Sequence, residues 1–261
     1  MKVVNRKKAG KRQTVRMFIL LVSFAVFPIT IVYLAPAPPF ISLKAGVINM
    51  SVITITTIFI SGFIFRRAFC GWLCPGGGCQ LVANPLNNKR LHNQNTNWFR
   101  VILVSIWVVM MISTLFIGDH ILKFEPGNPG AGKFATSEIR YFLPYIPVVV
   151  FMFLFVLMFG KRGFCHKGCW IYPILEFSTW TGKIIHTPSL YIEIINKEDC
   201  NDCKICTKNC SMSIDINSFV HTNTRLPNNC IQCGTCVDKC PNDVLKFSFG
   251  IEKKQFNNFD D

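Results

Sequence analysis

The stretch Cys200-Asn-Asp-Cys203-Lys-Ile-Cys206-Thr-Lys-Asn-Cys210 is followed by Cys230-Ile-Gln-Cys233-Gly-Thr-Cys236-Val-Asp-Lys-Cys240-Pro241. Both copies read C-x2-C-x2-C-x3-C, the spacing with which cysteines hold pairs of [4Fe-4S] clusters. Three thiolates in a tight loop wrap one cluster, and the fourth cysteine begins a short helix that points back to the other cluster. The spacing therefore predicts two ligand sets. The first is Cys200, Cys203, Cys206 and Cys240, and the second is Cys230, Cys233, Cys236 and Cys210.

Zinc and disulfides are the competing interpretations of these cysteines. Structural zinc sites use paired C-x2–4-C knuckles separated by a longer gap, which four cysteines within 11 residues do not match. Disulfides are disfavoured in a reducing cytoplasm, and the total of 13 cysteines is odd. Residues 189–195 and 244–249 alternate apolar side chains and are rich in β-branched and aromatic residues, so we expect two paired strands. Residues 186–261 are thus predicted to form a small α+β 2[4Fe-4S] ferredoxin-like domain.

Four long apolar runs precede this domain. A membrane-spanning helix needs about 20 mainly apolar residues, and charged residues lie between the runs instead of within them. Buried helices of a soluble core are the alternative, which this placement of charge disfavours. We therefore expect an α-helical integral membrane protein whose residues 17–185 contain four transmembrane helices. The runs are residues 17–34, 45–65, 101–117 and 141–159.

The net charge of +14 is concentrated in the first half of the chain, because no Asp or Glu precedes Asp119. The basic residues punctuate apolar runs and form no single face, so they indicate contact with lipid headgroups and exclude a nucleic-acid partner. Residues 1–16, a predicted cytoplasmic tail, hold seven Lys or Arg. With four spans, the positive-inside rule places both termini in the cytoplasm. The expected location is the inner (cytoplasmic) membrane, as a multi-pass protein.

A second repeat lies where two of the predicted spans end. Arg66-Arg-Ala-Phe-Cys70-Gly-Trp-Leu-Cys74-Pro75 and Lys161-Arg-Gly-Phe-Cys165-His-Lys-Gly-Cys169-Trp170 both read [RK]-R-x-F-C-x3-C. Cysteines four apart share one face if the helix continues, and Pro75 is expected to end the first helix. Convergence of Cys70, Cys74, Cys165 and Cys169 would make a third metal or redox site, holding another cluster or copper. The alternative is four small apolar residues packed at helix ends.

The order of spans, C-x3-C pairs and eight-cysteine tail resembles that of NapH-type membrane ferredoxins, the quinol-dehydrogenase components of periplasmic nitrate reduction. NosR-type polyferredoxins and FixG/CcoG oxidase-assembly proteins share parts of it. Cys70-x3-Cys74-Pro75 matches the C-x3-C-P motif of the family, whereas Trp170 replaces the proline after Cys169. The phrases around Cys165 and Cys206 are nearer to uncharacterised membrane 4Fe-4S proteins of anaerobes. The resemblance implies an electron-transfer protein that works with redox partner proteins and the quinone pool.

The function expected from the sequence is the passage of single electrons between a cytoplasmic or quinone donor and a membrane redox partner. The chain would act as a carrier or as a quinol-dehydrogenase-like subunit of an oxidoreductase complex. One alternative is a copper or other metal reductase or assembly factor that uses the thiols predicted at the membrane edge, Cys70, Cys74, Cys165 and Cys169, since soft thiolates favour Cu(I). Another is a non-catalytic redox-sensing subunit. Dinucleotide and c-type haem motifs are not present in the sequence.

Overall fold

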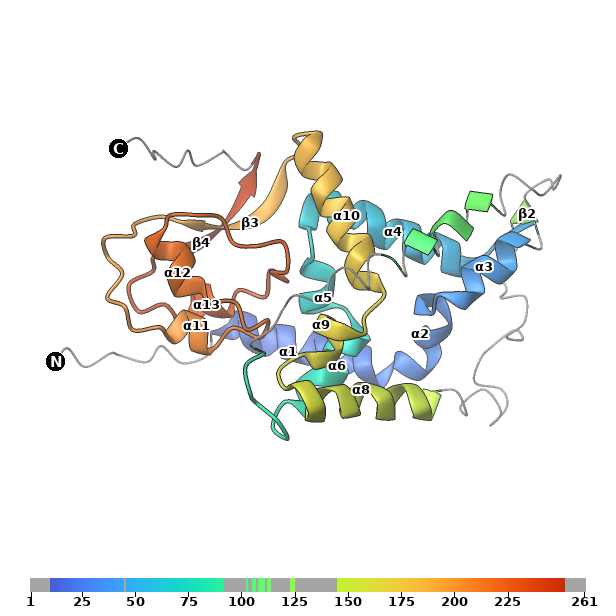
Figure 1. Cartoon of the computed structure of the whole chain (residues 1–261), viewed down its shortest axis with the longest axis horizontal. Helices are drawn as coiled ribbons and strands as arrows, with labels where there is room; N and C mark the ends of the chain where they lie inside the picture. The colour runs from blue at the N-terminus through green and yellow to red at the C-terminus, as the bar shows by residue number, and fades with distance from the viewer. Residues whose placement is uncertain are drawn as a thin grey trace.

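A computed structural model describes residues 10–44, 46–91, 102, 105–106, 108–110, 112–113, 123–124 and 145–251. The described elements form two parts that lie side by side (Figure 1). One part contains helices up to α10, and the other is the C-terminal module with strands β3 and β4. A continuous apolar core joins them, because Ile58 and Leu175 of the helical part belong to the same buried cluster as Ile192 and Met212. The two parts therefore make one packed unit.

The helical part is built from elements of unequal length, most of them short. The main pairs pack α1 on α6, α4 on α10 and α6 on α8. The elements are α1 Lys11–Ala25, α2 Phe27–Leu34, α3 Ala37–Lys44, β1 Val47–Ile48, α4 Met50–Phe65, α5 Ala68–Trp72, α6 Pro75–Ala83, β2 Lys123–Phe124, α8 Tyr145–Phe159, α9 Gly163–Lys167 and α10 Ile171–Ile184. Strands β1 and β2 pair in parallel.

The C-terminal module contains the predicted pair of strands. Strand β3 runs antiparallel to β4, with Ser189 opposite Gly250 and Ile194 opposite Leu245. Both predicted strands are thus confirmed to within a residue at their ends. Three short helices lie beside the pair. The module's elements are β3 Ser189–Ile194, α11 Ile205–Lys208, α12 Ile216–His221, α13 Thr235–Lys239 and β4 Leu245–Gly250.

The prediction of four single-helix spans is not supported. The run 17–34 is divided between α1 and α2, which are bent by 80°. Pro28 lies in the first turn of α2, a position that tolerates proline, whereas the interior of a helix does not. Helices α4 and α8 have 16 and 15 residues, and α4 ends at Phe65 because the next residue, Arg66, is left-handed with a φ of 53°.

No single helix in the described ranges is long and apolar enough to cross a membrane, although the bent pair α1–α2 passes the same length and composition test when taken together. The run 101–117 and the segment 118–140 lie mostly outside the described residues, as does most of the tail 1–16.

A glycine run lets α6 lie directly against α1. A Cβ atom on Gly78 would be 2.2 Å from the Leu20 carbonyl oxygen and 2.8 Å from the Phe24 Cβ. Real Cβ atoms do not approach a backbone atom so closely, so this position requires glycine. The run Gly76-Gly77-Gly78 therefore has a packing role, as its lack of a nucleotide-binding context suggests.

Gly78→Ala is expected to destabilise the protein by about 1–3 kcal/mol, the usual effect of overpacking a close contact. The reason is that α1 and α6 must separate to admit the methyl group. Thermal unfolding of the detergent-solubilised protein, followed by tryptophan fluorescence, measures the change. Gly10→Ala is the matched control, since the nearest atom to its new Cβ would be 4.0 Å away. Equal midpoints for the two variants would contradict the packing argument.

Candidate functional site

The two C-x3-C motifs adopt the same local structure. Each first thiol, Cys70 or Cys165, lies in a helix of five residues, α5 or α9. The Cys74 amide donates to the Phe69 carbonyl at 2.9 Å, and the Cys169 amide donates to the Phe164 carbonyl at 3.0 Å. The duplicated sequence thus encodes a duplicated turn.

This turn corrects one expectation. The helix does not continue through both cysteines of a pair, because α5 ends at Trp72 and α9 ends at Lys167. Pro75 does not stop the first helix but occupies the first position of α6, where its missing N–H is not needed. The second thiol of each pair therefore lies in the turn before the next long helix.

The turns bring together Cys70, Cys74, Cys165 and Cys169, which are called the membrane-edge thiols after the position that the sequence predicts for them. Each is buried, with 5 to 8% of its surface exposed (Cys70, Cys74, Cys165 and Cys169). The ionised forms would repel one another, since Cys74 interacts electrostatically with the other three members. Burial, followed by repulsion from Cys165 and Cys70, raises the pKa of Cys169 to about 12. A bound metal reverses this effect because it deprotonates its thiol ligands. The donor set is therefore suited to a thiophilic metal or cluster.

A buried cation lies against the same thiols. Arg67 is 1% exposed, its guanidinium carbon lies 3.9 Å from the centre of the Tyr172 ring, and its side chain hydrogen-bonds the Cys70 thiol. Its Nε atom has no hydrogen-bond partner among the residues that the structure describes. A buried guanidinium requires a counter-charge. Its ionisable neighbours are thiols and a tyrosine, Cys70, Tyr172, Cys165 and Cys169, so a negatively charged thiolate-bound centre fits this position.

Gln80 completes the surroundings of the membrane-edge thiols. It is fully buried, and its Nε2 donates to the Cys165 sulfur at 2.9 Å while its Oε1 accepts from the Cys165 amide at 3.3 Å. Sequence analysis did not identify Arg67 or Gln80 as site residues. Only their positions in the sequence could have identified them, because Arg67 lies three residues before Cys70 and Gln80 lies next to Cys79. Cys79 itself packs against Phe27 and Met152.

In the C-terminal module, two hollows contain the two predicted thiol sets. The first thiol set, Cys200, Cys203, Cys206 and Cys240, lines one small hollow. The second thiol set, Cys210, Cys230, Cys233 and Cys236, lines the other. Cys210 and Cys240 therefore each lie with the three cysteines of the other motif, as the spacing predicts. Ligation of a cluster by these residues stays a prediction.

The two cluster loops have matching backbone conformations. The residue before the second cysteine is left-handed in both, with φ of 55° at Asp202 and 52° at Gln232. The residue after it is also left-handed, with φ of 55° at Lys204 and 71° at Gly234. These turns curl each loop so that its three thiols face inward. A side chain on Gly234 would also clash with the Phe247 ring, 2.6 Å from the added Cβ.

Three thiols of the second set, Cys210, Cys233 and Cys236, are buried, and Cys230 is partly buried. Burial raises the pKa of Cys230 to about 12 and that of Cys210 to about 11. Cys233 behaves differently. Burial raises its pKa, but the Arg16 cation and hydrogen bonds from Thr235 and Ser211 outweigh that effect and leave the pKa below its ordinary value. Ser211, the residue after Cys210, thus lies near the Cys233 thiol, with its Oγ 3.6 Å from the sulfur.

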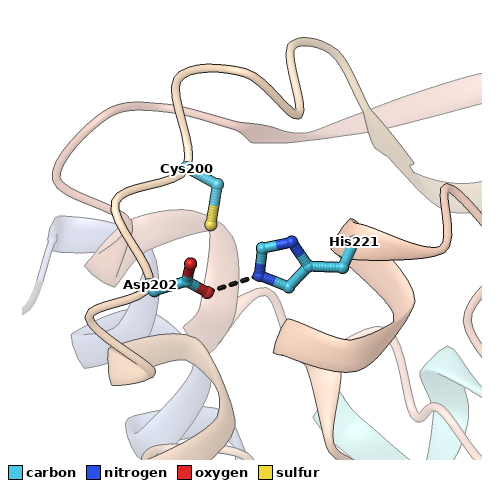
Figure 2. Close-up of side chains that lie close together, drawn as sticks. All are labelled: Cys200, Asp202 and His221. Carbon is cyan, nitrogen blue, oxygen red and sulfur yellow. Dashed lines mark hydrogen bonds and ion pairs between the residues drawn. The ribbon is translucent and has the colours of Figure 1, made fainter.

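A histidine and a carboxylate lie beside Cys200, a member of the first thiol set (Figure 2). The His221 Nε2 atom pairs with the Asp202 carboxylate, and both approach the Cys200 thiol, with the ligand atoms within 4.8 Å of one another. Hydrogen bonds from Asn217 and His221 lower the pKa of Asp202. Because Cys200 belongs to the first thiol set, we assign this group to the edge of that site.

Comparisons with known proteins match this layout. The family model of a 4Fe-4S dicluster domain matches residues 199–245, and that of a 4Fe-4S binding domain matches residues 47–92 and 142–188, which contain the two C-x3-C motifs. The chain is 27% identical to the ferredoxin-type protein NapH of Haemophilus influenzae over 70% of its own length and 62% of that protein. It is 24% identical to the regulatory protein NosR of Stutzerimonas stutzeri over 75% of its own length and 26% of that protein.

A further relative is the methylamine utilization ferredoxin-type protein MauN of Methylobacillus flagellatus, which is 25% identical over 66% of this chain and 60% of that protein. The chain thus spans about three fifths of the length of the NapH and MauN relatives. No solved structure matches it.

Proposed function

Because the chain belongs to the family of NapH/NosR-type 4Fe-4S polyferredoxins, we propose that it is a membrane-anchored iron–sulfur protein that passes single electrons to or from a membrane redox partner. A [4Fe-4S] cluster supplies one-electron redox chemistry when bound. The first and second thiol sets would each hold one cluster. The membrane-edge thiols would hold a third.

The observation that supports this proposal is the direct contact between the loop of the second thiol set and helix α5, which contains Cys70. Gly71, next to Cys70, lies so close to the loop 230–233 that a Cβ on it would be 2.3 Å from the Ile231 carbonyl oxygen. The Trp72 indole Nε1 donates to the Gln232 carbonyl at 3.0 Å. The loop of one site thus touches the helix of the other, which gives electrons a short path through protein.

Anchoring in a membrane is supported by the surface of the helical part. Large apolar side chains that are half exposed or more recur on α1, α4 and α8, including Phe18, Ile60, Phe151 and Met158. Contiguous apolar surface of this kind is uncommon on soluble monomers and indicates contact with lipid or a partner.

A third hollow, separate from those of the two thiol sets, supports a quinone as the electron donor or acceptor. Aromatic and aliphatic side chains of α4 and α10 line it, among them Phe59, Phe177 and Trp180, together with the carboxylate of Glu176. The Tyr172 hydroxyl donates to Glu176 at 3.5 Å, and the Tyr172 ring lies beneath Arg67. Glu176 would then exchange the proton that accompanies reduction or oxidation of the quinone, close to the membrane-edge thiols.

Iron and acid-labile sulfide analysis with low-temperature EPR, on the anaerobically purified full chain, tests the proposal. We expect about twelve Fe per chain, as three clusters require. About eight Fe with copper bound at the membrane-edge thiols would favour the metal-reductase alternative. Zinc in place of iron would overturn the assignment to electron transfer.

A further inference from the structure

Three arginines from the first half of the chain surround the second thiol set. We infer that Arg16, Arg67 and Arg90 raise the reduction potential of the cluster held there above that of the cluster in the first thiol set. An electron that enters the C-terminal module would then reside preferentially on the second cluster, next to α5. The inference rests on the proposed function. It gives these arginines, which the sequence pattern explains only as headgroup contacts, the role of raising the reduction potential of the second cluster through their charge.

Arg16 approaches the Cys233 side of the second hollow. The residue is 6% exposed, its Nη1 donates to the Gly71 carbonyl at 3.3 Å, and its Nε donates to the Gln13 Oε1 at 2.9 Å. Gln13 in turn donates to the Cys233 carbonyl at 3.0 Å. Arg16 interacts electrostatically with Cys233. The α1 helix thus inserts a buried cation between the second thiol set and α5.

Arg67 approaches from the side of Cys230. Its Nη1 donates to the Asn228 carbonyl at 3.5 Å, two residues before that thiol. It interacts electrostatically with Cys230 as well as with Cys70. The same guanidinium therefore lies between the second thiol set and the membrane-edge thiols, where its charge acts on both.

Arg90 approaches from the side of Cys210. Its Nη2 donates to the carbonyls of Ser213 at 3.2 Å and Ile214 at 3.4 Å. It interacts electrostatically with Cys210. Each of three thiols of the second set consequently has its own arginine, and the three arginines come from three different segments of the chain.

The surroundings of the first thiol set are balanced in charge. The charged residues that line its hollow are Asp199 and Lys204, one of each sign. Beside Cys200, the Asp202 carboxylate is paired with His221. Near the second set, the acidic group beside Arg16 is Asp238, which is paired with Arg12. Among the residues that the structure describes, an excess of positive charge is therefore found at the second set and not at the first.

Burial and charge act in opposite directions on the second cluster. Reduction adds negative charge, so the deeper burial of this site by itself would lower the potential. Cations at short range in a medium of low dielectric constant have the opposite effect and a large one. Without the arginines, the second cluster would be the harder of the two to reduce, and electrons would not be drawn toward α5.

The test is an EPR-monitored redox titration of the full-length protein carrying Arg16→Gln. We expect the ratio of reduced to oxidised second cluster to fall about tenfold at a fixed potential, a shift of about 59 mV for one electron. The potential of the first cluster should not change. Arg90→Gln should produce a shift in the same direction, and Arg16→Lys should restore most of the original value because it keeps the charge.

Lys246→Gln is the matched control, since it removes one positive charge from an exposed residue that pairs with Glu193 on the surface. It should shift neither potential. Equal potentials for the wild type, Arg16→Gln and Arg90→Gln, with both cluster signals present, would overturn the inference and leave the proposed function intact. The absence of cluster signals from the wild type would instead overturn the proposed function.

Discussion

Cys74→Ser is expected to stop electron transfer between the C-terminal module and the membrane partner, while about eight Fe per chain remain. Cys74 belongs to the buried membrane-edge thiols and interacts electrostatically with Cys70, Cys165 and Cys169. A serine hydroxyl stays protonated where a thiolate is needed, so the third centre would lose a ligand that the other three cannot replace. The first and second thiol sets contain no residue from this turn.

The measurement is reduction of a short-chain quinone by the full-length protein after its tail clusters are reduced, together with iron analysis. We expect the rate to fall at least about a hundredfold, because removal of one member of a group that acts as a unit abolishes most of the activity of the whole group. Cys79→Ser is the matched control, because Cys79 is also fully buried but packs against Phe27 and Met152 and interacts with only one of the four membrane-edge thiols, Cys165. It should retain about twelve Fe and the wild-type rate. An unchanged rate in the Cys74→Ser protein would show that the membrane-edge thiols are not needed for electron transfer.

The parts of the fold that short-range spacing determines could be predicted from the sequence. Three thiols must converge within one loop, so the grouping around the two hollows follows from local geometry, as do the flanking strands β3 and β4. The grouping of Cys210 with the three cysteines of the other motif follows from the repeat as well. The spacing of the C-x3-C motifs also indicated that these thiols act together.

The parts that depend on tertiary contacts could not be predicted. Hydropathy marks apolar runs but not the places where packing ends a helix, such as the bend before Pro28 and the left-handed Arg66. Charge patterning explains Arg16 and Arg67 as headgroup contacts, although both are buried against thiols. A linear pattern of charge contains no information about the partner of each cation. These arginines therefore became site residues only when the two parts of the fold were placed together.

Cys210→Ser and Cys206→Ser are expected to remove different clusters, although the two cysteines belong to one motif and are four residues apart. Cys210 lines the second hollow with Cys230, Cys233 and Cys236, whereas Cys206 lines the first. Each variant should lose about four Fe. Cys210→Ser should lose the EPR signal whose potential responds to Arg16, and Cys206→Ser should lose the other.

Serine can neither replace the buried thiolate nor hold the loop ends together, so the site that loses its ligand should also lose local structure, since cluster binding and folding are coupled. Limited proteolysis then locates the loss. The loop around Cys230 should become cleavable in Cys210→Ser, and the loop around Cys203 should become cleavable in Cys206→Ser. Loss of the same signal and the same loop in both variants would show that each motif binds its own cluster. In that case Cys210 would belong with Cys200, Cys203 and Cys206, and the proximity of the second thiol set to α5 would no longer identify which cluster passes electrons to the membrane edge.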